Sequence, residues 1–331
     1  MALPGLQAGW AAALLGEAAL PSEGRATCEA CPMCSGAAPP GRGFGAASKC
    51  CTYVPALPNF LAGAILAAAG PGSLQAKVSL RARMADRRCL TPHGVDPSPE
   101  EKERYAAVVA AGMFGRDPTL RCPHYLPGSG GCGIWRHRNS VCATWFCRHE
   151  RGAAGERFWQ ALERALTAIE LEFCHHCACV LLAGVEAPAD AEEADEVPEW
   201  AAFRGREEAY YREAAGLVAA MSPAEVLAIA AEGAGEAIAA LRAAHAALVA
   251  GPALDRLVVG TFAEVGREGD EARLLGYSEI DAVGVPAALV DALAAFDGRP
   301  TATVVAALAA AGVEVDAGTL RRLVDFGVLV P

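Results

Sequence analysis

The side chains best suited to chemistry in this chain are its thiols. Of 13 cysteines in 331 residues, nine fall in two groups before residue 150. The first group has the spacing C-x2-C-x2-C followed by a Cys-Cys pair, and the second is spread over residues 122–147. The nine are Cys28, Cys31, Cys34, Cys50, Cys51, Cys122, Cys132, Cys142 and Cys147. Closely spaced cysteines are the usual ligands of zinc and of iron–sulfur clusters, so the sequence predicts a metal centre.

The spacing alone leaves the ligand sets open. The C-x2-C-x2-C segment lets one turn of chain present three sulfurs to one centre, and Cys50 or Cys51 is the natural fourth ligand. The four cysteines of the second group would complete another set. The number of centres, one or two, is therefore not decided by the pattern.

The flanking sequence indicates a compartment in which thiols stay reduced. The first 20 residues are apolar but carry no Lys or Arg, and Glu17 interrupts them, which is unlike a secretory signal. No apolar run reaches the roughly 18–20 residues of a membrane span. We therefore expect a cytoplasmic protein without a membrane segment. The odd cysteine number favours thiolate ligands; a secreted, disulfide-bonded protein is the alternative.

Charge is distributed unevenly. The net charge is −11, but residues 21–151 hold 16 Lys and Arg against 9 Asp and Glu, whereas the remainder holds 12 against 30. A basic environment would lower the pKa of the thiols. The alternative is that the excess is incidental, because 25 of the 28 basic residues are Arg in an Ala-rich chain. The cysteine half lacks a dense basic stripe with interleaved aromatics, so no nucleic-acid partner is expected.

Periodicity predicts a mainly α protein with four regions. These are an N-terminal extension (1–20), an irregular metal-organised cysteine domain closed by a long helix (21–185), an acidic linker with Ala-rich helices (186–253), and an α+β tail (254–331). Helices are predicted at 57–69, 97–112, 155–182, 203–220, 223–249, 286–296, 301–311 and 316–327, and the linker at 186–199. Strand composition is found at 256–265 and 272–277, with Gly266 and Gly269 between them.

Two longer stretches point to a family. KCCTY at residues 49–53 precedes LPNFLAGAIL, and CPHYLPGSGGCGIWRHRNSVCATWFC occupies residues 122–147. Over residues 28–150 this order resembles the YkgJ-like family of zinc- or iron-chelating cysteine-cluster domains. The resemblance implies that the cysteines in these two stretches are ligands. The chain departs from the family where Arg-Pro and Cys-Arg are common, having Arg138-Asn139 and Cys142-Ala143. Flagellin lysine methylases have a similar motif that binds an iron–sulfur cluster, so the resemblance favours a 4Fe-4S cluster over Zn.

The tail suggests a second family. ARLLGYSEI, VPAALVDALAAFDGRPTATVVAAL and VDAGTLRRLVDFGVLVP combine a strand pair with three short helices. This tail resembles the PqqD-like winged-helix domains, which bind leader peptides. The resemblance implies a winged helix at 254–331 that docks a peptide or protein partner; a packing appendage is the alternative. The acidic helices, with Arg321 and Arg322 as the paired cations, argue against reading DNA.

Other candidate residues have simpler explanations. The side chains near the second cysteine group that could replace a thiolate are His124, His137 and His149. The segment containing Cys174, His175, His176, Cys177 and Cys179 is interpreted as helix packing. Cys132 with His137 would suit a nucleophile and base, but ligation explains this cysteine better. Gly128 to Gly133 lacks the strand and helix of a phosphate loop.

The sequence is compatible with three functions. The leading hypothesis is a structural or electron-transfer iron–sulfur or zinc protein whose tail docks a partner. The second is a peptide- or protein-modifying enzyme, a methylase or an oxidoreductase, that uses a cluster with an open coordination position. The third is metal storage or delivery. No catalytic residue is assigned.

Overall fold

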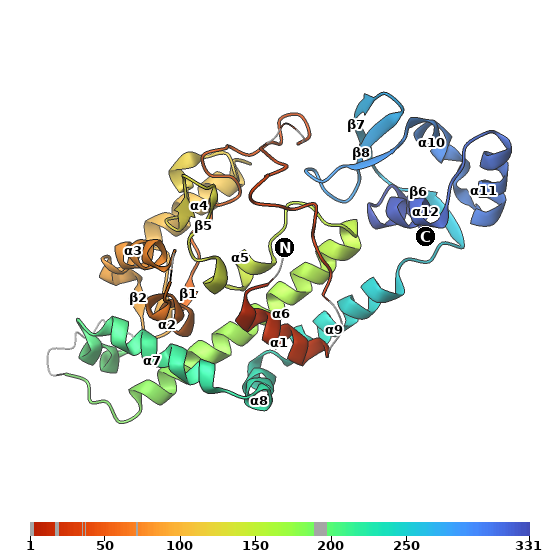
Figure 1. Cartoon of the computed structure of the whole chain (residues 1–331). Coiled ribbons are helices and arrows are strands. Elements are labelled where there is room, and N and C mark those ends of the chain that lie inside the picture. Colours follow the sequence, from red (N-terminus) through yellow and green to blue (C-terminus); the bar gives the residue numbers. More distant parts are fainter. Residues whose placement is uncertain (1–2, 17–19, 35, 37, 71, 189–196) are drawn as a thin grey trace.

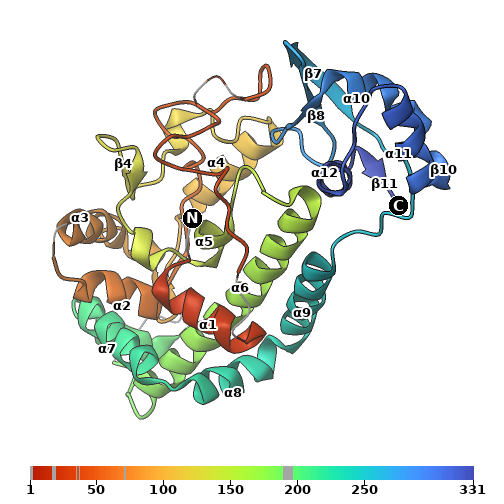
Figure 2. The ribbon, with the colours of Figure 1, turned by 45° about the vertical axis from the view of Figure 1, so that its right-hand side comes forward.

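The computed structural model describes residues 3–16, 20–34, 36, 38–70, 72–188 and 197–331 (Figure 1). The fold is mainly α-helical with small antiparallel sheets, as the sequence predicts at this level. Helix α6 (Gly152–Leu182) runs through the centre of the molecule, and helices that precede and follow it in the sequence pack around it (Figures 1 and 2).

Helix α6 is central because its apolar side chains recur at helical spacing. Phe158, Leu162, Leu166, Ile169 and Phe173 are fully buried along it. The helix begins at Gly152, three residues before the predicted start. By length and composition alone α6 could cross a membrane, but its packing is that of a core helix, and a core helix passes the same test.

The N-terminal and Ala-rich helices cover α6. Helices α1 (Gly5–Leu15), α8 (Pro223–Gly233) and α9 (Gly235–Ala250) all contact it. Trp10 of α1 stacks on Phe173 with ring centroids 5.1 Å apart. The prediction of one helix over 223–249 is wrong. Ala234 has φ −104° and ψ 5°, and the glycines on either side of it have low helix propensity, so the chain breaks there.

A second helical layer is formed by α2 (Asn59–Ala67) and α7 (Glu207–Ala220), which lie side by side (Figure 1). Gly63 permits this approach, because a Cβ there would lie 1.7 Å from the Tyr211 carbonyl oxygen. The helix predicted at 57–69 is shorter, because it begins at Asn59 and ends at Ala67. The helix predicted at 203–220 begins at Glu207, after the 3-10 helix η4 (Pro198–Phe203). Most of the predicted linker at 186–199 lies outside the described residues.

Short elements connect these layers to the cysteines. Helix α3 (Ser73–Met84) follows α2, and α4 (Pro99–Ala110) begins with the Ser98 capping box, inside the predicted range 97–112. One small sheet has the order β1-β3-β2. Its strands are β1 (Leu57–Pro58), β2 (Leu90–Thr91) and β3 (Gly94–Val95). The 3-10 helices η1 (Arg87–Cys89) and η2 (Pro118–Leu120) complete this part.

The tail forms a unit with its own apolar core, seen in blue in Figure 2. One sheet has the order β7-β8-β9 and the other β10-β6-β11. The strands are β6 (Arg256–Val259), β7 (Ala263–Glu268), β8 (Glu271–Leu275), β9 (Val283–Pro286), β10 (Asp297–Pro300) and β11 (Leu329–Val330). The helices are α10 (Ala287–Ala292), η5 (Leu293–Ala295), α11 (Thr301–Ala310) and α12 (Ala317–Asp325).

The predicted strand at 256–265 is two strands in different sheets. Gly260 lies between them, and a Cβ there would be 2.3 Å from the Gly327 carbonyl oxygen. The chain therefore leaves the β10-β6-β11 sheet at Gly260, where its backbone lies against Gly327, just after the end of α12. The hairpin joins β7 to β8, with Gly269 in the turn at φ 59°.

Candidate metal centre

Eight of the nine predicted cysteines line one cavity of about 150 Å³. They are Cys28, Cys31, Cys50, Cys51, Cys122, Cys132, Cys142 and Cys147. Cys34 does not line the cavity, but its thiol forms a hydrogen bond with that of Cys31. All 13 cysteines are free thiols. The structure therefore brings together side chains up to 119 positions apart in the sequence, as counted from Cys28 to Cys147.

Backbone contacts join the two cysteine groups. The Cys122 amide donates to the Cys51 carbonyl at 2.8 Å. Lys49 adds a second link, since its Nζ donates to the carbonyls of Cys28 and Gly130, the latter at 2.8 Å. Lys49 has φ 53°, a region that non-glycine residues rarely adopt. This turn directs Lys49 and the adjacent cysteine pair toward the same cavity.

Local structure positions the second group. Strands β4 (Tyr125–Leu126) and β5 (Gly131–Cys132) pair so that Cys132 lies opposite Tyr125. After the 3-10 helix η3 (Trp135–His137), the Asn139 side chain caps α5 (Ser140–Thr144) by accepting from the Cys142 amide at 3.1 Å. A cap fixes the first turn of a helix, so Cys142 is held at a defined place on the cavity wall.

Aromatic side chains form much of the remaining wall: Phe44, Tyr53, Tyr105, Phe114, Trp135, Trp145 and Phe146. Among the described residues that line the cavity, two are cations, Lys49 and Arg138, and none is Asp or Glu. The cavity thus combines thiols, a largely apolar wall and positive charge. Such surroundings suit a group that is itself negatively charged.

Arg138 is a buried cation in the cavity wall. Its guanidinium is buried, stacks on Trp135 at 3.6 Å, and donates from Nη1 to the Cys142 carbonyl at 2.8 Å. Its Nη2 is buried without a hydrogen-bond partner. A buried donor on a cation normally has an acceptor, and none is found for this nitrogen among the described residues.

Burial governs the ionisation of the thiols. It raises the pKa of Cys122 and Cys147 to about 12 and that of Cys132 to about 11. It also raises the pKa of Cys28 and Cys142, in each case with neighbouring thiolates adding to the effect. With pKa values this high the buried thiols stay protonated near neutral pH, so ligation would require a positive centre that favours the thiolate.

Cys51 differs from the other thiols. Its pKa is lowered, mainly because the Cys50 thiol donates a hydrogen bond to it, with Lys49 and Arg138 contributing. The same hydrogen bond raises the pKa of Cys50. Of this adjacent pair, Cys51 is therefore the side chain that ionises more readily.

The spacing of the donors differs between a single-ion site and a cluster site. The cysteines are distributed around a cavity of about 150 Å³. Among the described residues, no three Cys, His, Asp or Glu side chains are grouped closely enough to bind a single ion. A cluster separates its ligands because iron and sulfide atoms stand between them. Zinc instead needs four ligands about 2.3 Å from one point.

The histidines have other roles in this arrangement. His124 lines the cavity, but its ring nitrogens contact Ser79 Oγ at 2.8 Å and Arg83 Nη1 at 3.2 Å. Desolvation lowers its pKa to about 3, followed by repulsion from Arg83. His149 Nδ1 contacts the Tyr277 hydroxyl at 3.2 Å, and His137 does not line the cavity.

The cysteines at the end of α6 lie elsewhere. Cys174 and Cys177 are buried in the apolar core, whereas Cys179 is exposed and His175 contacts the ring of His93. Sequence reasoning missed Lys49 and Arg138 as cavity residues. Their only local signal was the basic excess around the cysteines. Comparison of the chain with protein-family models, curated proteins and solved structures found no match.

Proposed function

We propose that this protein binds an iron–sulfur cluster, of the 4Fe-4S type, in the cavity lined by eight cysteines. The cluster would serve a structural or electron-transfer role. The observation that carries this proposal is the gathering of cysteines from two sequence groups around one volume. The unpartnered Nη2 of Arg138 and the positively charged lining support an anionic thiolate–cluster unit over a simple cation.

Cysteine substitution tests the proposal. Cys142→Ser and Cys132→Ser should each remove most of the iron retained after anaerobic purification, because a serine oxygen is a poor replacement for a thiolate ligand. Cys179→Ser, at an exposed cysteine outside the cavity, is the matched control and should leave iron content unchanged. Equal iron content in all three variants would reject the cavity as the binding site.

A second candidate is an enzyme whose cluster has an open coordination position, favoured by the combination of the cysteine motif with a tail that resembles peptide-binding domains. Aromatic side chains border the same cavity as the cysteines and leave part of its wall free of ligands. The resemblance to the flagellin lysine methylases gives the class, a methylase or an oxidoreductase acting on a peptide or protein. A serine scan separates the candidates. Three essential cysteines per cluster indicate an open position, and four indicate a closed one.

We further propose that the winged-helix resemblance of residues 254–331 reflects docking of a peptide or protein. Strand β7 is at the edge of its sheet, and five of its six residues are exposed. An extended peptide can pair with such an edge through main-chain hydrogen bonds. Residues 254–331 hold 12 Asp and Glu against 6 Arg, and this net negative charge supports a peptide rather than a nucleic acid.

Selection from a displayed peptide library on the intact, metal-loaded protein tests this docking. Val265 lies at a bulge outside the β7–β8 register, so Val265→Pro should interrupt the edge while the hairpin remains paired. Selected peptides should lose binding to this variant and keep it in Arg299→Ala, which is outside β7. Peptides that bind both variants equally would exclude β7 as the docking edge.

A further inference from the structure

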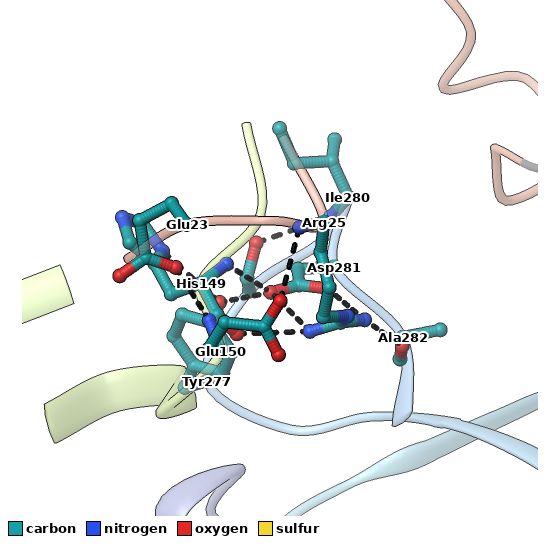
Figure 3. A network of polar contacts seen from close by, with 9 residues as sticks. Glu23, Arg25, His149, Glu150, Tyr277, Ile280, Asp281 and Ala282 are labelled. Atoms are coloured by element: carbon teal, nitrogen blue, oxygen red, sulfur yellow. Dashed lines mark hydrogen bonds and ion pairs between the residues drawn. The ribbon is translucent and has the colours of Figure 1, made fainter. Parts of the chain in front are cut away.

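A buried carboxylate in the C-terminal unit contacts both segments that carry the cysteines. Asp281 lies in the loop between β8 and β9 and is fully buried. Its Oδ1 pairs with Arg25 Nη2 at 2.8 Å, and its Oδ2 accepts from the His149 amide at 2.9 Å and from Arg25 Nη1 at 3.3 Å. The Tyr277 hydroxyl donates to Oδ2 as well. Figure 3 shows these groups converging on the carboxylate.

The donors to Asp281 belong to the two ligand segments. Arg25 lies three residues before Cys28, and His149 lies two residues after Cys147. Arg25 also binds the second segment directly, since its Nη1 donates to the His149 carbonyl at 2.9 Å. Its Nη2 donates to the Ala282 carbonyl at 3.0 Å. One ion pair therefore joins the first cysteine segment, the second cysteine segment and the C-terminal unit.

Neighbouring carboxylates extend the same connection to the core (Figure 3). Glu150 accepts from the Arg25 amide at 3.0 Å, and the Glu150 amide donates to Glu23 at 2.6 Å. Glu23 in turn accepts from Trp159 Nε1 of α6 at 2.6 Å. The backbone next to Cys28 and the backbone next to Cys147 are thus tied to each other and to the central helix.

We propose that Asp281 is a positioning residue for the metal centre. It holds the Cys28 and Cys147 segments at the separation that a bound cluster requires, although it is itself no ligand. The inference rests on the proposed cluster function and adds a role for the C-terminal unit. Groups that orient ligands are as necessary to a metal site as the ligands themselves. Because binding free energies are reciprocal, a bound cluster would also strengthen the attachment of the C-terminal unit.

The test uses the full chain carrying its metal. Asp281→Asn removes the charge that holds Arg25 while keeping the side-chain size, and we expect iron release to a chelator about 10–100-fold faster. A changed visible or EPR spectrum should accompany the faster release, because the ligand segments shift. Asp281→Glu retains the charge and should restore most of the slow release.

Asp325→Asn is the matched control. Asp325 is another buried carboxylate of the C-terminal unit, paired with Arg151 at the start of α6, and among the described residues no hydrogen bond or ion pair links it to Arg25 or His149. Its loss should leave the spectrum and the release rate unchanged. Equal acceleration in both variants would overturn the inference, because general loosening of the unit would then explain the result. Unchanged release in Asp281→Asn would overturn it as well.

A second variant covers the case in which Asp281→Asn does not fold. Arg25 is partly exposed, so Arg25→Lys keeps the positive charge but loses the two-nitrogen geometry. Arg25→Lys should release iron faster than the wild type, as Asp281→Asn does, and unchanged release would contradict the inference. Failure of the proposed function is distinguishable, because the wild-type protein would then contain no iron before any variant is compared.

Discussion

The buried carboxyl of Glu170 on α6 makes a specific prediction about stability and pH. Glu170 is 4% exposed and accepts hydrogen bonds from the Ser140 amide and hydroxyl and from Gln7 Nε2. Desolvation raises its pKa from 4.5 to about 7, although these donors oppose the shift. The network lies directly behind α5, whose Cys142 lines the cavity, so it connects the core to the site.

The direction in which the free energy of unfolding changes with pH follows from the proton bound to Glu170 in the folded state. Between pH 4.5 and 7 the folded protein keeps the Glu170 proton that the unfolded chain has lost, so the free energy of unfolding decreases as the pH rises. The stabilisation is fully present below pH 4.5 and is lost through pH 7. A shift of about 2.5 pKa units corresponds to about 3 kcal/mol over the full range.

Urea unfolding at pH 5 and pH 8 measures this effect. Glu170→Gln keeps the shape of the side chain and removes its titration. The pH-dependent loss of stability should be smaller in the variant by about 2–3 kcal/mol. Glu172→Gln, a partly exposed carboxyl on the same helix, is the control and should behave as the wild type. Identical pH dependence in wild type and Glu170→Gln would refute the argument.

Three further predictions concern the site and the packing around it. Arg138→Gln should make iron release to a chelator about 10–100-fold faster, because the cation that offsets thiolate charge is lost, whereas the exposed Arg136→Gln should not. Gly63→Ala should lower the free energy of unfolding by about 2–3 kcal/mol, measured by urea titration, because the new Cβ would overlap the Tyr211 carbonyl; a more stable variant would contradict this packing. Metal removal should increase hydrogen exchange in residues 20–58 far more than in α6, and equal exchange with and without metal would count against metal-dependent order there.

The helices were largely predictable because their signals are local. The period of apolar residues in α6 and the capping serines of α4 and α8 fix those elements within a few residues. The break at Ala234 was missed because Ala-rich sequence continues across it. The split of the predicted strand at Gly260 depends on Gly327, which is distant in sequence, and no local pattern reveals such a contact.

The cysteines that line the cavity were predictable from their spacing, and eight of the nine predicted residues line it. Their surroundings were not predictable. The burial of Arg138 and the turn at Lys49 arise from tertiary packing, since nothing in a short window distinguishes these residues from other surface cations. The contact of Asp281 with His149 spans 132 positions of sequence and becomes visible only when the segments are assembled.

Anomalous diffraction at the iron absorption edge, from crystals of anaerobically purified protein, tests the central claim most directly. The account predicts iron peaks inside the cavity, within bonding distance of cysteine sulfurs that include Cys142 and Cys132, together with sulfide equimolar to iron in the same preparation. A folded protein without iron in this cavity, or with a single zinc ion bound elsewhere, would contradict it.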